Sequence, residues 1–234
     1  MSCRLAIFCL LVPFGAALAQ DFSGSVLRVH AVAADGTIKL GSGVLIAPGQ
    51  VATSCHVTRG AAVIDLSVQG RRWAVVDQRG SVRHDLCLLR SPDIDLQPVT
   101  MRSSQELEPG EPVVASGFEG GDHASVMHGT IAALYKFDHG NVIRTDARFD
   151  FGSSGGALFD RAGKLVGILA FKARAGEQLR FALPTEWIAP GSAVRSMFKT
   201  VGPDIAGIAF WEQAHGERPA FLGVALRESR IKQD

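Results

Sequence analysis

Short apolar segments separated by glycine- and proline-containing turns run along most of the chain. Alternating or continuous apolar runs of this length predict β-strands. The first group of predicted strands is Ser25–Val32, Gly43–Ala47, Ala62–Val68, Trp73–Asp77 and Leu86–Leu89. The second group is Val113–Gly117, Ala124–Leu134, Val142–Thr145, Leu165–Phe171 and Arg180–Leu183. One segment, Pro184–Phe198, has helical spacing, and short strands of this kind are typical of a sandwich or barrel.

A polar, proline-containing stretch, Asp93–Pro112, lies between the two groups of strands. We therefore predict an all-β protein with two halves of similar size, at residues 20–105 and 106–199. A short helix closes the second half, and the less regular residues 200–234 form a C-terminal extension.

The first residues have the pattern of an export signal. Arg4 precedes the apolar run Leu5–Phe14, and small residues ending in Ala17-Leu18-Ala19 follow. The run is shorter than the ~20 apolar residues that a membrane-spanning helix needs. We expect residues 1–19 to be removed as a signal peptide, which leaves an exported chain without an integral membrane segment. The pattern does not separate the periplasm from secretion.

Composition excludes several classes of function. The 234 residues are 47% apolar and 20% charged, which is not the composition of a disordered chain. A formal net charge of +1 supplies no basic field, so we predict no nucleic-acid partner. Asp122, His123 and His128 match no standard zinc spacing, and we predict neither a metal nor a cofactor. The oligomeric state stays open.

Three segments carry residue types that suit nucleophilic catalysis. They contain His56, Asp85 and, within a glycine-rich loop, Ser154. A serine hydroxyl is a weak nucleophile until an imidazole takes its proton, and a carboxylate holds that imidazole in the required tautomer. The surrounding glycines permit a tight turn in which the N–H groups of Gly152 and Ser154 can face a developing oxyanion.

These segments, in the order histidine, aspartate, serine on an all-β pattern, resemble the trypsin- and chymotrypsin-like serine peptidases, especially the bacterial HtrA/Deg-like branch. The similar segments are Thr53–Val57, Asp85–Leu89, Thr145–Gly156 and Leu165–Ile168, and the resemblance covers about residues 22–198. It implies two six-stranded β-barrels, with His56 as the general base, Asp85 as the orienting acid and Ser154 as the nucleophile. It also implies an endopeptidase that cleaves a protein or peptide substrate through an acyl-enzyme.

The chain departs from the family pattern at Ser153. Zymogen-activated enzymes carry an aspartate there that pairs with a new N-terminus, so we expect no activation cleavage beyond signal removal. HtrA/Deg relatives usually carry asparagine at this position and a PDZ domain afterwards, and we expect this chain to lack the PDZ domain.

The family pattern also locates a substrate pocket, with Arg148 at its base and Ala170, Phe171 and Lys172 along its wall. The two cations either favour acidic side chains or extend to solvent and leave a small apolar pocket. Neither arrangement suits a preference for lysine or arginine.

Cys55 and Cys87 are the cysteines that remain after signal removal. If His56 and Asp85 touch as the resemblance implies, these cysteines lie on adjoining strands and can form a disulfide that braces the base and its acid. A pair of buried free thiols is the alternative.

Two other functions stay open. The loop Gly152–Gly156 also fits the G-x-S-x-G elbow of esterases, but that fold requires a histidine after the serine, and the one available is His215. The other alternative is a peptidase-fold binding protein that is catalytically silent, or an enzyme whose oxyanion loop is misformed until it is activated.

Overall fold

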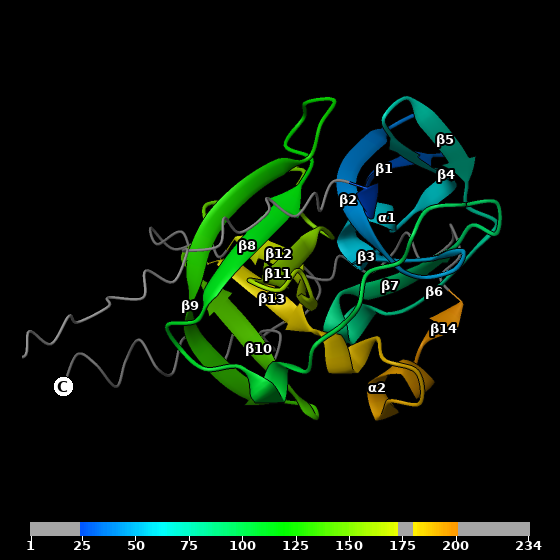
Figure 1. Cartoon of the computed structure of the whole chain (residues 1–234). Coiled ribbons are helices and arrows are strands. Elements are labelled where there is room, and N and C mark those ends of the chain that lie inside the picture. Colours follow the sequence, from blue (N-terminus) through cyan, green and yellow to red (C-terminus); the bar gives the residue numbers. More distant parts are fainter. Residues whose placement is uncertain (1–23, 173–179, 201–234) are drawn as a thin grey trace, which may run out of the picture.

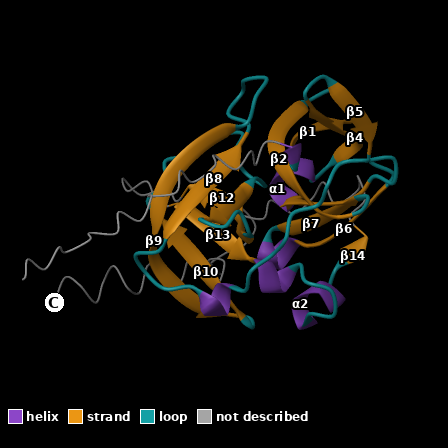
Figure 2. Ribbon diagram, viewed as in Figure 1, coloured by secondary structure: helices purple, strands orange, loops and turns teal. Residues whose placement is uncertain are grey.

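The computed structural model describes residues 24–172 and 180–200. In Figure 1 the described chain forms two groups of strands that lie side by side, one blue to teal with the orange β14 at its edge, and one green to yellow. Helical segments are short and lie at the ends of strands or in connections between them (Figure 2). The predicted all-β fold class is confirmed.

The first group is an eight-stranded sheet in the order β14-β6-β7-β3-β2-β1-β4-β5, with antiparallel neighbours. Its strand β14 comes from the end of the described chain and pairs with β6, Lys199 opposite Gly80. Alternate residues face inward, and Leu66 and Leu89 are fully buried. The bounds are β1 (Val26–Ala33), β2 (Ile38–Ala47), β3 (Gln50–Ser54), β4 (Ala61–Val68), β5 (Arg71–Ala74), β6 (Asp77–Ser81), β7 (Leu86–Arg90) and β14 (Lys199–Thr200).

The second group is a closed barrel in the order β10-β13-β12-β11-β8-β9, as predicted for this half. Closure pairs both edges of every strand and leaves no open sheet edge. Leu158, Val166 and Ile143 are fully buried in its apolar core. The bounds are β8 (Pro112–Gly117), β9 (Ser125–Phe137), β10 (Gly140–Thr145), β11 (Ala157–Asp160), β12 (Leu165–Lys172) and β13 (Arg180–Pro184).

The single helix predicted over Pro184–Phe198 is wrong in its extent. The segment forms a 3₁₀ turn, η4 (Thr185–Trp187), and a one-turn helix, α2 (Ala193–Ser196). Gly191 interrupts it with a φ of 78°, which is outside the helical region. Ser192 then caps α2 by accepting a hydrogen bond from the N–H of Arg195 at 3.0 Å.

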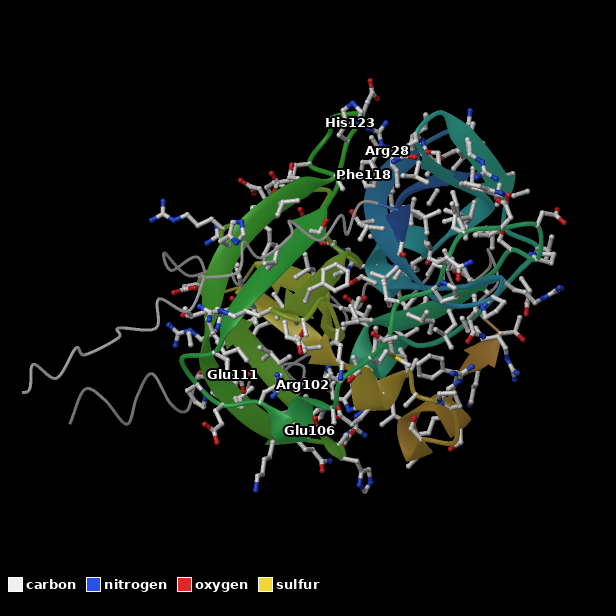
Figure 3. All side chains as sticks on the ribbon, viewed as in Figure 1. Arg28, Arg102, Glu106, Glu111, Phe118 and His123 are labelled. Atoms are coloured by element: carbon white, nitrogen blue, oxygen red, sulfur yellow. A yellow bond between two sulfur atoms is a disulfide. The ribbon has the colours of Figure 1, made fainter. Side chains whose placement is uncertain are left out.

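The connection between the two groups of strands runs from the end of β7 to the start of β8 and contains η3 (Ser104–Glu106). Arg102 holds it to the second barrel: its guanidinium lies 2.8 Å from Glu111, 3.6 Å from Glu106 and 3.5 Å from Asp160. Figure 3 shows Arg102, Glu106 and Glu111 close together, at the lower end of the molecule in that view. The boundary at residues 105 and 106 stays a prediction.

No helix in the described ranges has the length and apolar character needed to cross a bilayer. The signal peptide predicted at residues 1–19 lies outside the described residues, as does the C-terminal extension beyond residue 200.

Candidate active site

His56 and Asp85 come together because their strands are paired. His56 lies in the one-turn helix α1 (Cys55–Thr58), directly after β3, and Asp85 lies between η2 (Val82–His84) and β7. The register places Ser54 opposite Leu86. One carboxylate oxygen of Asp85 is 2.7 Å from His56 Nδ1, and the other accepts the backbone N–H of His56 at 2.9 Å. The carboxylate therefore orients both the ring and the start of α1.

The backbone of Asp85 is bent so that this contact can form. Its φ of 51° lies in the left-handed region, which aspartate tolerates better than most residues. Its carbonyl accepts the N–H of Cys55 at 3.1 Å, and its side chain is only 2% exposed. The turn thus directs a buried carboxylate at the imidazole.

The electrostatics of His56 follow from this contact. Burial is the largest single influence and by itself lowers the pKa of His56, and Lys39 and Arg59 act in the same direction. The charge and hydrogen bond of Asp85 outweigh these effects, so the pKa of His56 is raised above the ordinary histidine value. With Nδ1–H directed at Asp85, the neutral ring has Nε2 as its proton acceptor.

A disulfide joins Cys55 to Cys87, with 4.9 Å between the Cα atoms, and confirms the predicted pairing. Both cysteines are buried. Gly80 on β6 packs against the bridge, since a Cβ there would lie 2.5 Å from the Cys87 sulfur. The bridge links α1 to β7 beside the contact between His56 and Asp85.

Replacing both cysteines with alanine should lower the free energy of unfolding by roughly 3–4 kcal/mol, the loop-closure value for a bridge of this sequence separation. The cause is the greater freedom of the unfolded chain once residues separated by 32 positions are no longer tied. Urea unfolding of the wild type and the double variant measures the difference. Equal transition midpoints at equal slope would show that the bridge contributes nothing to stability.

The glycine-rich loop that carries Ser154 packs against the first sheet, where β3 runs into α1. Gly155 has a φ of 85°, and a Cβ there would lie 2.1 Å from the carbonyl oxygen of Ser42 and 2.3 Å from Thr53 Oγ1. The N–H of Ser42 donates to the carbonyl of Ser154 at 2.8 Å. Only glycine fits at position 155, and the close approach joins the two halves of the molecule.

Ser154 lies beside the helix that carries His56. A Cβ built on Gly41 would lie 2.6 Å from the Val57 side chain and 3.2 Å from the Ser154 carbonyl oxygen, so both residues flank Gly41. Ser154 is partly exposed, and within the described ranges its hydroxyl makes no hydrogen bond, to His56 or to any other group. The adjacent Ser153 is fully buried and donates to Glu119 at 3.1 Å. Of the two serines, Ser154 is the accessible one.

The backbone N–H groups of this loop divide into bonded and unbonded sets. The bonded N–H groups and their acceptors are Phe151 to Asp150 Oδ1, Ser153 to the carbonyl of Asp150, Gly155 to that of Leu169 and Gly156 to that of Ser153. Those of Gly152 and Ser154 donate to no acceptor in the described part of the chain. The loop therefore has two N–H groups without an acceptor among the described residues, and the oxyanion hole that the sequence predicts at Gly152 and Ser154 stays a prediction.

The predicted pocket residues are described only in part. Arg148 is exposed, which favours the interpretation in which its guanidinium extends to solvent. Ala170 is 1% exposed in β12. The side chains of Phe171 and Lys172 lie outside the described residues, so the specificity pocket stays a prediction.

His84 has hydrogen-bond partners that the sequence did not predict. Its Nδ1 is 2.7 Å from Ser81 Oγ and its Nε2 is 2.9 Å from Asp138 Oδ2. The ring is 1% exposed and meets Trp187 edge-on at 4.6 Å, and burial lowers its pKa. His84 ties the turn before Asp85 to the β9–β10 turn of the second barrel, a long-range contact that no local pattern signals.

His123 in the β8–β9 connection and His128 in β9 belong to no metal-binding group among the described residues. His123 lies at the far end of this connection in Figure 3, and Asp122 pairs with Arg28 at 3.3 Å. Across residues 24–172 and 180–200, no three His, Cys, Asp or Glu side chains are grouped to hold a metal ion.

Two packed β-sheets, with His56 and Asp85 in contact on the first and the loop of Ser154 packed against it from the second, have the architecture of the chymotrypsin-like peptidases. Residues 41–168 match the trypsin-like peptidase domain, and the chain belongs to this family. It is 38% identical over 135 residues to a probable periplasmic serine endoprotease DegP-like of Marinomonas sp. (strain MWYL1), and 34% identical over 138 residues to the periplasmic serine endoprotease DegP of Escherichia coli (strain K12). Each match covers 55% of this chain and 29% of the relative, so the chain spans less than a third of their length.

Solved structures give the same picture. A variant of the HtrA-type protease AlgW with a tripeptide superposes with a TM-score of 0.63 at 30% identity, over 71% of this chain and 58% of that one. A protease of M. tuberculosis in its active form gives a TM-score of 0.64 at 21% identity, over 70% and 77% of the two chains. The second likeness supports the fold alone.

Proposed function

We propose that the chain is a serine endopeptidase in which Ser154 is the nucleophile, His56 the general base and Asp85 the residue that orients His56. The observation that carries this proposal is the pattern of the loop N–H groups. Those of Gly152 and Ser154 are unbonded among the described residues, and every other N–H from Phe151 to Gly156 has an acceptor. A loop with two free donors beside an accessible serine is suited to binding an oxyanion.

In the first half of the reaction the Ser154 hydroxyl attacks the peptide carbonyl carbon while its proton passes to His56 Nε2. The negative charge on the carbonyl oxygen is stabilised by the N–H groups of Gly152 and Ser154. The carbon–nitrogen bond then breaks as His56 gives its proton to the departing amine. The products are a free amine and an ester between Ser154 and the acyl part of the substrate.

In the second half a water molecule attacks the ester carbon, and His56 takes the proton of that water. The same N–H groups stabilise the second oxyanion, and Ser154 recovers its proton from His56 as the ester bond breaks. Asp85 holds the imidazole in place and stabilises its charged form. The cycle uses groups of this chain, the substrate and water.

The relatives are named periplasmic serine endoproteases, and we propose a protein or peptide substrate and an exported location for this chain as well. The export signal predicted at residues 1–19 supports this location. The esterase alternative does not fit the structure, because Ser154 is followed by strand β11 and the elbow requires a helix there.

One observation favours a second candidate, an enzyme that is inactive until a peptide or protein substrate binds. Ser154 Oγ makes no hydrogen bond to His56 within the described chain, although such contacts in unliganded peptidases often tighten only when substrate binds. Adding a peptide or protein substrate would raise the labelling rate in the experiment below if activation is required.

The test of the proposed function is labelling with a fluorescent fluorophosphonate. The Ser154 oxygen would form a bond to phosphorus, fluoride would leave, and the phosphoryl oxygen would occupy the oxyanion site. We expect the label on the tryptic peptide that contains Ser154, and a large loss of label in His56→Ala. An unlabelled, folded wild type, with and without added casein, would contradict the proposal.

A further inference from the structure

Ser42 lies on β2 in the first sheet and reaches the oxyanion loop of the second barrel. Its side chain is fully buried, and its hydroxyl donates to the carbonyl of Gly152 at 2.7 Å. The same oxygen accepts the N–H of Phe118 at 2.8 Å. The hydroxyl therefore has both a donor and an acceptor partner, which fixes its hydrogen in the direction of Gly152.

Gly152 is held from a second side by the segment that follows β8. Its φ is 90°, and a Cβ there would lie 2.2 Å from the carbonyl oxygen of Phe118. A Cβ at Gly117 would lie 2.8 Å from Ser153 Cα. The loop thus lies against residues 117 and 118 with no space between the backbones. Figure 3 places Phe118 between the two halves and close to Arg28, whose guanidinium is 5.2 Å from the Phe118 ring centre.

Glu119 holds the other end of the same turn. One oxygen of its carboxylate accepts the N–H of Asp150 at 2.6 Å and the hydroxyl of Ser153 at 3.1 Å. Ser153 stands where HtrA/Deg relatives usually carry asparagine. The hydrogen bond from its hydroxyl to Glu119 therefore uses a side chain that departs from the family pattern. The turn from Asp150 to Ser153 is then closed by the bond from the N–H of Ser153 to the carbonyl of Asp150 at 3.1 Å.

We propose that Ser42 and Glu119 are positioning residues that hold the oxyanion loop in its binding conformation, Ser42 through the Gly152 carbonyl and Glu119 through Asp150 and Ser153. The inference rests on the proposed function. The N–H of Gly152 belongs to the peptide group between Phe151 and Gly152, which lies between the turn held by Glu119 and the Gly152 carbonyl held by Ser42, so these contacts restrict its rotation. A peptide group that rotates would replace a donor with a carbonyl oxygen in the same place, which repels an oxyanion.

The size of the expected effect can be judged from the loss of one oxyanion donor, which lowers the rate by a factor of ~10²–10³. Loss of a positioning contact leaves the donor present but less well held, so we expect smaller effects. Ser42→Ala and Glu119→Ala should each lower the limiting rate of fluorophosphonate labelling by about 10- to 100-fold, with little change in the probe concentration at half-maximal rate. Glu119→Gln should restore most of the rate, because its amide oxygen can accept both hydrogen bonds.

Two variants serve as matched controls. Ser91 is also fully buried and donates to a backbone carbonyl, that of Ala74, at 2.8 Å. Glu186 also accepts hydroxyl and backbone N–H groups, from Ser103, Ser104 and Gln105. Ser91→Ala and Glu186→Ala remove contacts of the same kind away from the loop. They should lower the melting temperature by amounts comparable to those of the test variants and leave the labelling rate unchanged.

The possible results separate this inference from the proposed function. Failure of the wild type to label contradicts the proposed function itself. A wild type that labels on Ser154, with Ser42→Ala and Glu119→Ala labelling at the wild-type rate, overturns the inference and leaves the function standing. Equal slowing in the control variants would also overturn it, since it would show a general loss of stability. If Ser42→Ala does not fold, the comparison of Glu119→Ala with Glu119→Gln decides.

Discussion

Replacing Ser154 with alanine should abolish fluorophosphonate labelling and lower the turnover of casein by a factor on the order of 10⁶, the size of the loss in another Ser-His-Asp peptidase. The nucleophile is then gone, and His56 has no hydroxyl from which to take a proton. The Cβ of residue 154 remains, so the loop and its contact between the Ser154 carbonyl and the N–H of Ser42 are kept. The variant should therefore fold and melt like the wild type.

The neighbouring serine provides the control for this prediction. Ser153 is buried and its hydroxyl is bonded to Glu119, so it is not placed to attack a substrate. Ser153→Ala should still accept the label on Ser154, at a rate reduced by the loss of that bond. Labelling that survives in Ser154→Ala and disappears in Ser153→Ala would show that Ser153, and not Ser154, is the nucleophile.

Strands whose inward residues are large and apolar were predictable from the sequence. β4 and β12 are of this kind, and each starts within one residue of the prediction. Four strands were missed: β3 reads QVATS and β6 reads DQRGS, with mostly small or polar residues, while β11 and β14 are only four and two residues long. β6 lies between β7 and β14, and its small Gly80 packs on the disulfide. Their strand form is set by neighbours distant in the sequence, which a local pattern cannot reveal.

The candidate site shows the same division. His56, Asp85 and Ser154 were found because each lies in a segment that resembles the family, and the structure brings the first two into contact. Ser42 and Glu119 were not found. A serine between two glycines in a strand and a glutamate in a loop carry no local signal, because their role depends on contacts 110 and 34 residues away along the chain.

Replacing Asp85 should have the second large effect, on both the rate and the pH dependence of fluorophosphonate labelling. Its carboxylate accepts from both the ring and the backbone of His56, and it is the source of the raised pKa of the imidazole. A protonated His56 cannot take the proton of Ser154, so the labelling rate should rise with pH as His56 loses its proton. In the wild type the midpoint of that rise should lie above about 6.5, the ordinary pKa of histidine.

Asp85→Asn removes the negative charge and leaves the burial of the imidazole and the nearby Lys39 and Arg59, all of which lower the pKa of His56. The midpoint should therefore move to lower pH, below the ordinary value. The plateau rate at alkaline pH should fall by a factor of ~10⁴, because the asparagine amide can donate to Nδ1 and so favours the tautomer that carries its proton on Nε2. A full pH profile of the labelling rate for both proteins measures the two effects together. A variant with a lower plateau and an unmoved midpoint would show that Asp85 does not set the pKa of His56, and one with an unchanged plateau would remove Asp85 from the proposed mechanism.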